Sequence, residues 1–227
     1  MRLLAAAALF TSTAALAWPV EKVIELEPGK DTIVRIGNAE WFDLDDPKVA
    51  AAEALESGDE MLLTGKTPGR ALLMVYAEGK PIVYSLRVGK SDAKAAQAAL
   101  QPALKACPKL TYKPAEYEKL TGDVPDVKCR APLLEALKSD VVEAKEVALV
   151  FDATVLAAQL TEIKAALAQA KNPLAVHYEG ATLVLEGKAE LPQLKRALWE
   201  SFKHSACRIA LDNRAEISAP PDGGTAK

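Results

Sequence analysis

The chain has 227 residues, of which half are apolar, and its 31 acidic side chains slightly outnumber its 28 lysines and arginines. Charges of both signs are interspersed, so neither nucleic acid nor anionic lipid is expected as a main partner. The length exceeds one average domain, and the apolar content suffices for packed cores.

Residues 1–17, MRLLAAAALFTSTAALA, have the pattern of a secretory signal peptide. Arg2 gives a short basic region, the apolar run that follows is too short for a comfortable bilayer span, and Ala15-Leu16-Ala17 is a small-residue cleavage site. We expect cleavage after Ala17, which leaves 210 of the 227 residues once 17 are removed. The mature chain, from Trp18, is then periplasmic and has no transmembrane segment.

Residues 18–89 predict a small, mostly β domain. Short alternating runs are separated by turn residues such as Pro-Gly, Gly-Asn and Ser-Gly-Asp. This spacing favours a small sandwich or a curled sheet. Trp41 and Phe42 are adjacent, and two neighbours on a strand cannot both face inward. One of these rings is therefore a candidate exposed interaction residue; a turn with one ring buried is the simpler alternative.

The stretch TGKTPGRALLMVY, residues 64–76, has Gly-Lys-Thr but does not fit a phosphate-binding loop. The first glycine of such a loop would stand at position 60, where the chain has Glu60, and no helix is expected to follow. We interpret the stretch as a hairpin, in which a turn joins two strands. Pro68 and Gly69 form the predicted structural turn.

The second half alternates helices and strands, which makes the whole chain α+β. Residues 90–106 predict a linking helix, with Ser91 as its cap, Asp92 in its first turn and Pro102 kinking or ending it. Residues 107–217 predict an α/β domain, in which only the part from EVALVFD onward is clear: a buried strand, a helix, a hairpin, a helix and a strand. The Pro/Gly-rich tail, 218–227, is expected to be disordered.

No catalytic, cofactor-binding or metal-binding set emerges, so we expect a protein that is not an enzyme. His177 and His204 have no second histidine at ligand spacing, and the acidic stretch EWFDLDDP lacks the remaining ligands of a calcium loop. No G-x-S-x-G nucleophile turn occurs.

Three cysteines are expected to meet an oxidising compartment after export, where a disulfide can persist. A Cys107–Cys129 bridge would support the polar segment between these residues, which has few apolar side chains of its own. Pairings of Cys207 with Cys107 or with Cys129 remain open beside this one, and Cys207 could instead be a buried thiol or pair between chains.

Residues 21–89 resemble the N-terminal domain of the secretins of pilus-assembly and type II/III secretion systems. The segments LEPGKDTIVRI, DLDDPKVAAAEAL and LLTGKTPGRALLMVYAEGKPIVYSLRV carry this resemblance. It implies that Gly65, Pro68 and Gly69 are structural turn positions of that domain. Residues 157–217, with YEGATLVLEGKAE, more weakly resemble a BON-type or ring-building module. The long β-rich channel of secretins has no counterpart in the sequence, so we expect that this chain does not form the outer-membrane pore.

The resemblance implies a non-enzymatic periplasmic assembly or scaffold protein of a pilus or secretin-type apparatus. Its partners would be a secretin or other pilus or secretion subunits, with self-association as a further expectation. The alternative is a free-standing envelope protein whose BON-like module binds lipid or cell wall.

Overall fold

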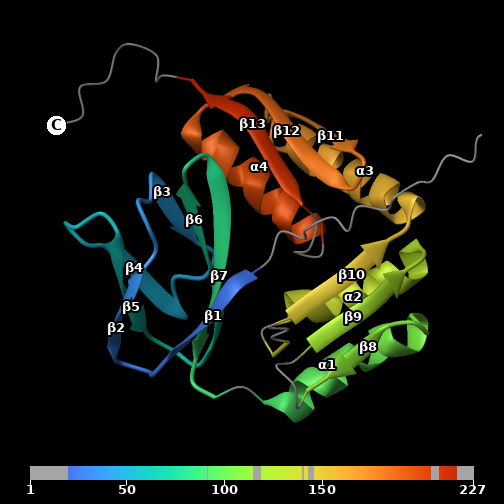
Figure 1. Ribbon diagram of the computed structural model, residues 1–227, viewed down its shortest axis with the longest axis horizontal. Helices are drawn as coiled ribbons and strands as arrows, with labels where there is room; N and C mark the ends of the chain where they lie inside the picture. The colour runs from blue at the N-terminus through green and yellow to red at the C-terminus, as the bar shows by residue number, and fades with distance from the viewer. Residues whose placement is uncertain are drawn as a thin grey trace, which may run out of the picture.

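The computed structural model describes residues 20–90, 92–114, 119–139, 141–142, 146–205 and 210–218. The fold is α+β, as predicted: strands β1 to β7 come first, and helices then alternate with strands (Figure 1). The expected signal peptide and all but Ser218 of the expected tail lie outside the described residues. Among the described helices, none is both long and apolar enough to cross a membrane.

The first seven strands form two sheets that enclose one core, which we call the sandwich. One sheet has the order β1-β7-β6-β3 and the other has the order β2-β5-β4. Pairing is antiparallel, except that β1 runs parallel to β7. The bounds are β1 (Val20–Leu26), β2 (Asp31–Arg35), β3 (Trp41–Leu44), β4 (Ala50–Ala54), β5 (Glu60–Gly65), β6 (Gly69–Ala77) and β7 (Lys80–Val88).

Alternation of side chains along the strands builds the sandwich core. Met61 and Leu63 in β5 are fully buried, whereas Leu62 between them is only partly buried. They meet Leu73 and Leu86 of the other sheet in one apolar cluster. The tight β6–β7 connection has positive φ at Glu78 and Gly79, the geometry of a type I′ hairpin turn.

The predicted turn after Gly65 joins the two sheets and is not a hairpin. Strands β5 and β6 flank it, but β5 pairs with β2 and β4, and β6 pairs with β3 and β7. Pro68 lies in the connection, as expected, whereas Gly65 and Gly69 are the strand residues at its two ends. A Cβ at Gly65 would lie 2.6 Å from the carbonyl oxygen of Glu27, so this glycine permits a close approach of two backbones.

Two modules with the same topology follow the sandwich. Each runs helix, strand, strand, helix, strand, and in each sheet the second strand is central, antiparallel to the first and parallel to the third. The middle module comprises α1 (Ala93–Ala106), β8 (Thr111–Lys113), β9 (Lys119–Val124), α2 (Val127–Lys138) and β10 (Glu146–Phe151). The last module comprises α3 (Ala153–Gln169), β11 (Ala175–Glu179), β12 (Thr182–Ala189), α4 (Leu191–His204) and β13 (Leu211–Ile217).

The helix expected as a linker, α1, is a structural part of the middle module. Its Leu100 and Ala103 are fully buried in the core of that module. Asp92, expected in the first turn, is its N-cap and accepts hydrogen bonds from two backbone N–H groups of that turn. Pro102 lies inside the helix and does not end it. Ser91, the expected cap, lies outside the described residues.

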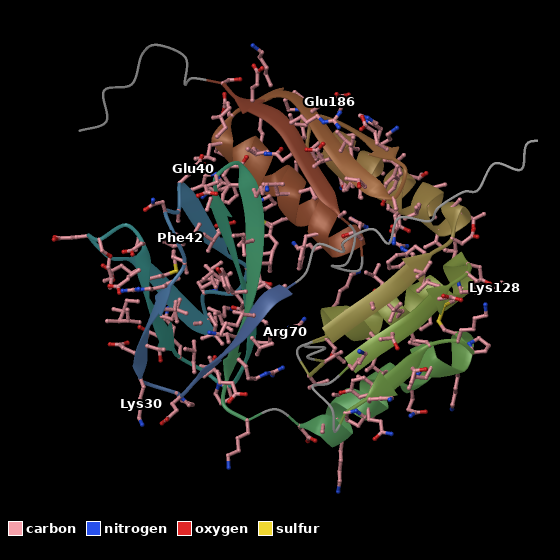
Figure 2. The ribbon with its side chains drawn as sticks, viewed as in Figure 1. Lys30, Glu40, Phe42, Arg70, Lys128 and Glu186 are labelled. Atoms are coloured by element: carbon pink, nitrogen blue, oxygen red, sulfur yellow. A yellow bond between two sulfur atoms is a disulfide. The ribbon has the colours of Figure 1, made fainter. Side chains whose placement is uncertain are left out.

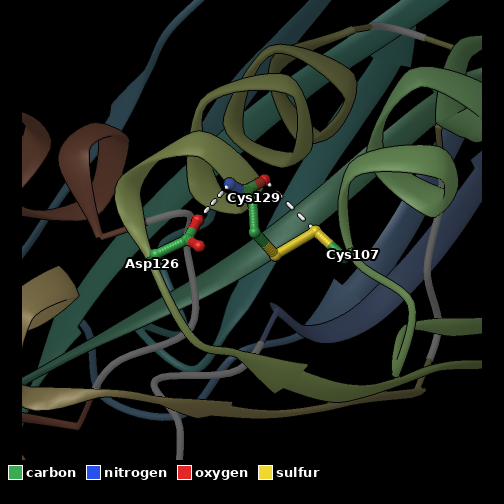
Figure 3. Close-up of a disulfide and its surroundings, with 3 residues drawn as sticks. All are labelled: Cys107, Asp126 and Cys129. Carbon is green, nitrogen blue, oxygen red and sulfur yellow. Dashed lines mark hydrogen bonds between the residues drawn. A yellow bond between two sulfur atoms is a disulfide. The ribbon is translucent and has the colours of Figure 1, made fainter.

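A disulfide joins Cys107 to Cys129, which confirms one of the three pairings considered. Cys107 ends α1, and Cys129 lies in the first turn of α2, where its N–H donates to Asp126 over 2.8 Å (Figure 3). The Cys107 sulfur also lies 3.3 Å from the Cys129 carbonyl oxygen, a contact only, because a disulfide sulfur carries no proton. The bridge therefore ties the two helices behind one sheet; Cys207 lies outside the described residues.

Replacing Cys107 and Cys129 together by alanine should lower the free energy of unfolding by about 3 kcal/mol, because the open chain gains entropy when the bridge is lost. Urea unfolding of the exported protein, followed by circular dichroism, measures this loss. The wild-type protein in reductant should show a similar loss, and unchanged stability in both experiments would contradict the structural role.

Candidate interaction site

Trp41 and Phe42 point to opposite faces of β3, and neither is a freely exposed ring. Trp41 is only 8% exposed, so the expectation of an exposed ring is wrong for it. Its indole stacks on Tyr76 at a centroid distance of 4.8 Å, and the Lys195 ammonium lies 4.9 Å from the indole centroid. Phe42 is half-buried against the sandwich core (Figure 2). Both faces of β3 are covered, one by the second sheet and the other by the last module.

We call this contact between the sandwich and the last module, around Trp41, Tyr76 and Lys195, the seam. Hydrogen bonds reinforce it. The Trp199 indole N–H donates to Asp43 over 2.7 Å, and Lys195 donates to the carbonyl oxygen of Phe42 over 3.2 Å. The Asn213 amide donates to the Tyr76 hydroxyl over 2.5 Å. Burial raises the pKa of Tyr76, as expected for a hydroxyl in this seam. Trp41, Tyr76 and Trp199 therefore stabilise the contact between the sandwich and the last module.

Arg70 connects the sandwich to the middle module. Its guanidinium donates to the carbonyl oxygens of Leu137 and Lys138 at the C-terminal end of α2, and to that of Val142 beyond the helix, over 2.7–3.3 Å (Figure 2). The last carbonyls of a helix have no partner within the helix and carry partial negative charge, so a cation is favourable there.

A charged cluster joins the middle module to the last module. Arg130 on α2 is buried and makes a bidentate pair with Glu162 on α3, with distances of 2.8 and 2.7 Å. It also donates to the carbonyl oxygen of His204, and the His204 ring lies 3.1 Å from Glu162. The Arg130 hydrogen bonds, helped by His204, hold the pKa of Glu162 below its ordinary value.

The outer face of the last module carries charges that are paired with one another. Arg214 makes a bidentate contact with Glu179, at 2.8 Å for both bonds, and a further bond with Asp212. Arg214, and then His177 at 3.3 Å, lower the pKa of Glu179 to about 2. His177 is thus part of a surface network. Among the described residues, no three His, Cys, Asp or Glu side chains are placed to hold a metal ion.

Strand β10 is the apolar edge of the middle sheet. The sequence predicts a buried strand here, and this prediction is wrong for one of the two faces of β10. Val147, Leu149 and Phe151 turn toward the helices, whereas Val150 on the opposite face is 66% exposed. The prediction failed because only one face of this sheet is covered by its own helices, α1 and α2 (Figure 1).

The backbone of β10 also has a free edge. The N–H of Asp152, just after the strand, donates to the carbonyl oxygen of Val124, the last residue of β9. Backbone groups alternate in direction along a strand, so those of Val147, Leu149 and Phe151 point away from β9. No described strand pairs with this side of β10. Edge strands usually carry charges that prevent pairing; the equivalent β13 has three, whereas β10 has one, at its first residue.

The other residues singled out from the sequence do not contribute to this edge. Gly65, Pro68 and Gly69 shape the turn between the two sandwich sheets, and the Cys107–Cys129 bridge lies in the helix layer of the middle module. The run VALVF is the sequence feature that could have indicated a contact site at β10. Five uncharged residues favour such a site when one face of the strand is uncovered.

No family model matches the chain, and no curated protein matches it. The solved structures with slight similarity include two of S-layer proteins. Domains 4 and 5 of the S-layer protein SbsC are 12% identical, with a TM-score of 0.26, over 30% of this chain and 48% of that chain. The S-layer protein rSbsC(31-844) is 10% identical, with a TM-score of 0.25, over 44% of this chain and 14% of that chain. Likenesses this slight carry no argument about fold or function.

Glu162→Gln should destabilise the protein at pH 7 by about 1–2 kcal/mol, since it leaves buried Arg130 without its anion, and the partial exposure of Glu162 moderates the cost. The folded pKa of Glu162 is lowered, so its contribution is present above the ordinary carboxyl pKa and is lost as the pH falls through the folded pKa. Urea unfolding between pH 7 and pH 3 should therefore show a smaller acid loss in the variant.

The matched control is Glu135→Gln on α2, whose carboxylate makes only an exposed pair with Lys138. This change should leave both stability and its pH dependence nearly unaltered. An acid loss in Glu162→Gln as large as that of the wild type would contradict the role of the Arg130–Glu162 pair.

Proposed function

We propose that the protein is a non-enzymatic periplasmic assembly protein of a pilus or secretin-type secretion apparatus, and that it acts through protein–protein contacts. The free, apolar edge of β10 is the observation that carries this proposal. The resemblance of residues 21–89 to the secretin N-terminal domain supplies the class of apparatus. The Cys107–Cys129 bridge agrees with an exported protein.

The proposed contact is the addition of a strand to β10. An extended segment of a partner protein would pair with the outward-pointing backbone groups of Val147, Leu149 and Phe151, which supply affinity without depending on side-chain identity. Val150 and Ala148 on the uncovered face would be shielded by an apolar side chain of the incoming segment. Contacts of this kind need no catalytic group, and they suit a scaffold.

Val150→Lys should abolish capture of the partner, because a lysine on this strand cannot be covered by an apolar segment. Tagged mature protein would be used to recover binding proteins from envelope extracts, and the eluates identified by mass spectrometry. The wild type should recover a secretin or other pilus or secretion subunits, and Val150→Lys should recover at least about tenfold less.

Ile217→Lys is the matched control, because Ile217 is also an exposed apolar residue on the third strand of its module. It should retain partner capture. Equal recovery by wild type and Val150→Lys would refute the β10 contact. Recovery of lipid or murein in place of protein subunits would favour the alternative, an envelope protein that binds lipid or cell wall through its last module.

A further inference from the structure

Among the described strands, β2 of the sandwich is another open edge, and its chemistry differs from that of β10. Strand β2 has the sequence DTIVR and lies at the edge of the sheet β2-β5-β4. Exposed and partly buried side chains alternate along it: Asp31, Ile33 and Arg35 are exposed, and Val34 packs against the sandwich core. Ile33 is 59% exposed, which is unusual for a β-branched residue at the centre of an edge strand.

The hydrogen bonds to β5 determine which backbone groups of β2 remain open. The N–H of Ile36 donates to the carbonyl oxygen of Asp59, and the N–H of Gly65 donates to the carbonyl oxygen of Lys30. Even-numbered residues of β2 therefore face β5, and the N–H and C=O groups of Asp31, Ile33 and Arg35 point to the open edge. The same residues thus offer both free backbone groups and exposed side chains.

The charges of β2 are symmetric about Ile33 and opposite in sign. Asp31 stands two residues before Ile33, and Arg35 stands two residues after it. Asp31 accepts a hydrogen bond from the Thr64 hydroxyl over 2.6 Å, and Arg35 lies 3.6 Å from Glu60, so both side chains are kept on the outer face of the sheet. Arg35 nevertheless remains 82% exposed and available to a second anion.

We propose that the protein forms a two-fold dimer by antiparallel pairing of β2 with β2 of a second copy, centred on Ile33. In this register Ile33 lies opposite Ile33 of the second copy, and Asp31 lies opposite Arg35. Each outward N–H and C=O of these residues gains a partner, the exposed isoleucines cover each other, and both charges face an opposite charge. The two short sheets become one continuous sheet across the dimer axis.

The position of β2 leaves room for a second copy. Its sheet is the part of the sandwich farthest from the middle and last modules, and Lys30, directly before β2, is labelled at the periphery (Figures 1 and 2). A two-fold axis at Ile33 therefore directs the bulk of the two copies to opposite sides. Strand β10 lacks this self-complementarity, because no arginine or lysine on it could face its one acidic residue, Glu146.

Two charge-reversed variants test the register. Asp31→Lys alone places two cations opposite each other in each outer pair, and Arg35→Glu alone places two anions there, so each homodimer should be at least about tenfold weaker than the wild type. An equimolar mixture should form a heterodimer, because the introduced lysine then faces the introduced glutamate, and the unchanged Arg35 faces the unchanged Asp31. Sedimentation equilibrium of the mature proteins measures all four samples. Lys22→Glu on edge strand β1 is the control and should dimerise as the wild type does.

A second measurement identifies the central pair directly. Residues opposite each other in a hydrogen-bonded antiparallel pair have Cα atoms about 5.5 Å apart, within the range of a disulfide. Ile33→Cys should therefore cross-link into a dimer under mild oxidation, whereas Val150→Cys should not. Non-reducing gels of the wild type identify any dimer linked through Cys207, and far-UV circular dichroism verifies that each variant is folded.

A wild-type protein that stays monomeric at about 100 µM, where even weak strand pairing should register, would overturn the proposal. A mixture that associates no better than either variant alone would also overturn it. This test uses the purified chain without a partner, so its failure leaves partner capture at β10 unaffected. Conversely, a failed capture experiment has no bearing on the β2 dimer.

Discussion

The stacking of Trp41 on Tyr76, with Lys195 over the indole, is the contact on which the rest of the arrangement depends. It places an aromatic surface on the outer face of a sandwich sheet, where an isolated sandwich would present an exposed apolar patch. Helix α4 covers that patch, and the Trp199–Asp43 hydrogen bond fixes its position. The last module therefore packs against the sandwich, although the middle module separates the two in the sequence.

For function, two kinds of surface can be distinguished: those buried in contacts between the parts of the protein, and the sheet edges that such contacts leave uncovered. Arg70, Arg130 and the seam aromatics are engaged in contacts between the three parts of the protein, so they position these parts relative to one another. At β10 and β2, no strand in the described part of the chain pairs with the outer edge, and an exposed apolar side chain lies on each strand. Edges of this kind can recognise extended segments, which is the mode of contact proposed above.

Local signals in the sequence predict much of the fold. Alternation and turn residues predict the strands of the sandwich, and the helix–hairpin–helix–strand order of the last module follows from clear periodicity. The middle module is harder to predict from local signals. Strand β8 has only three residues, and the sequence of α1 is typical of a linking helix as long as its packing against α2 is unknown. Cys107 and Cys129 are separated by a polar segment, so their pairing stays open until the helices are placed.

Burial depends on partners distant in sequence, which is why the candidate site was less predictable than the fold. Trp41 is covered by residues more than 150 positions later, a contact that no local pattern encodes. Val150 shows the opposite case: its apolar run is typical of a buried strand, but only one face of its sheet is covered by helices. The opposite charges at the two ends of DTIVR can be seen in the sequence. They indicate self-pairing only once β2 is known to be an edge strand.

The central claim is that the sandwich and the two modules form one cooperative body held by the seam. Equilibrium unfolding in urea tests this claim when tryptophan fluorescence is compared with far-UV circular dichroism of the whole fold. Two of the three tryptophans, Trp41 and Trp199, lie at the seam. The account predicts coincident transitions with a single midpoint. A fluorescence transition that is complete while most of the circular dichroism signal remains would show that the parts fold independently, and it would contradict the account.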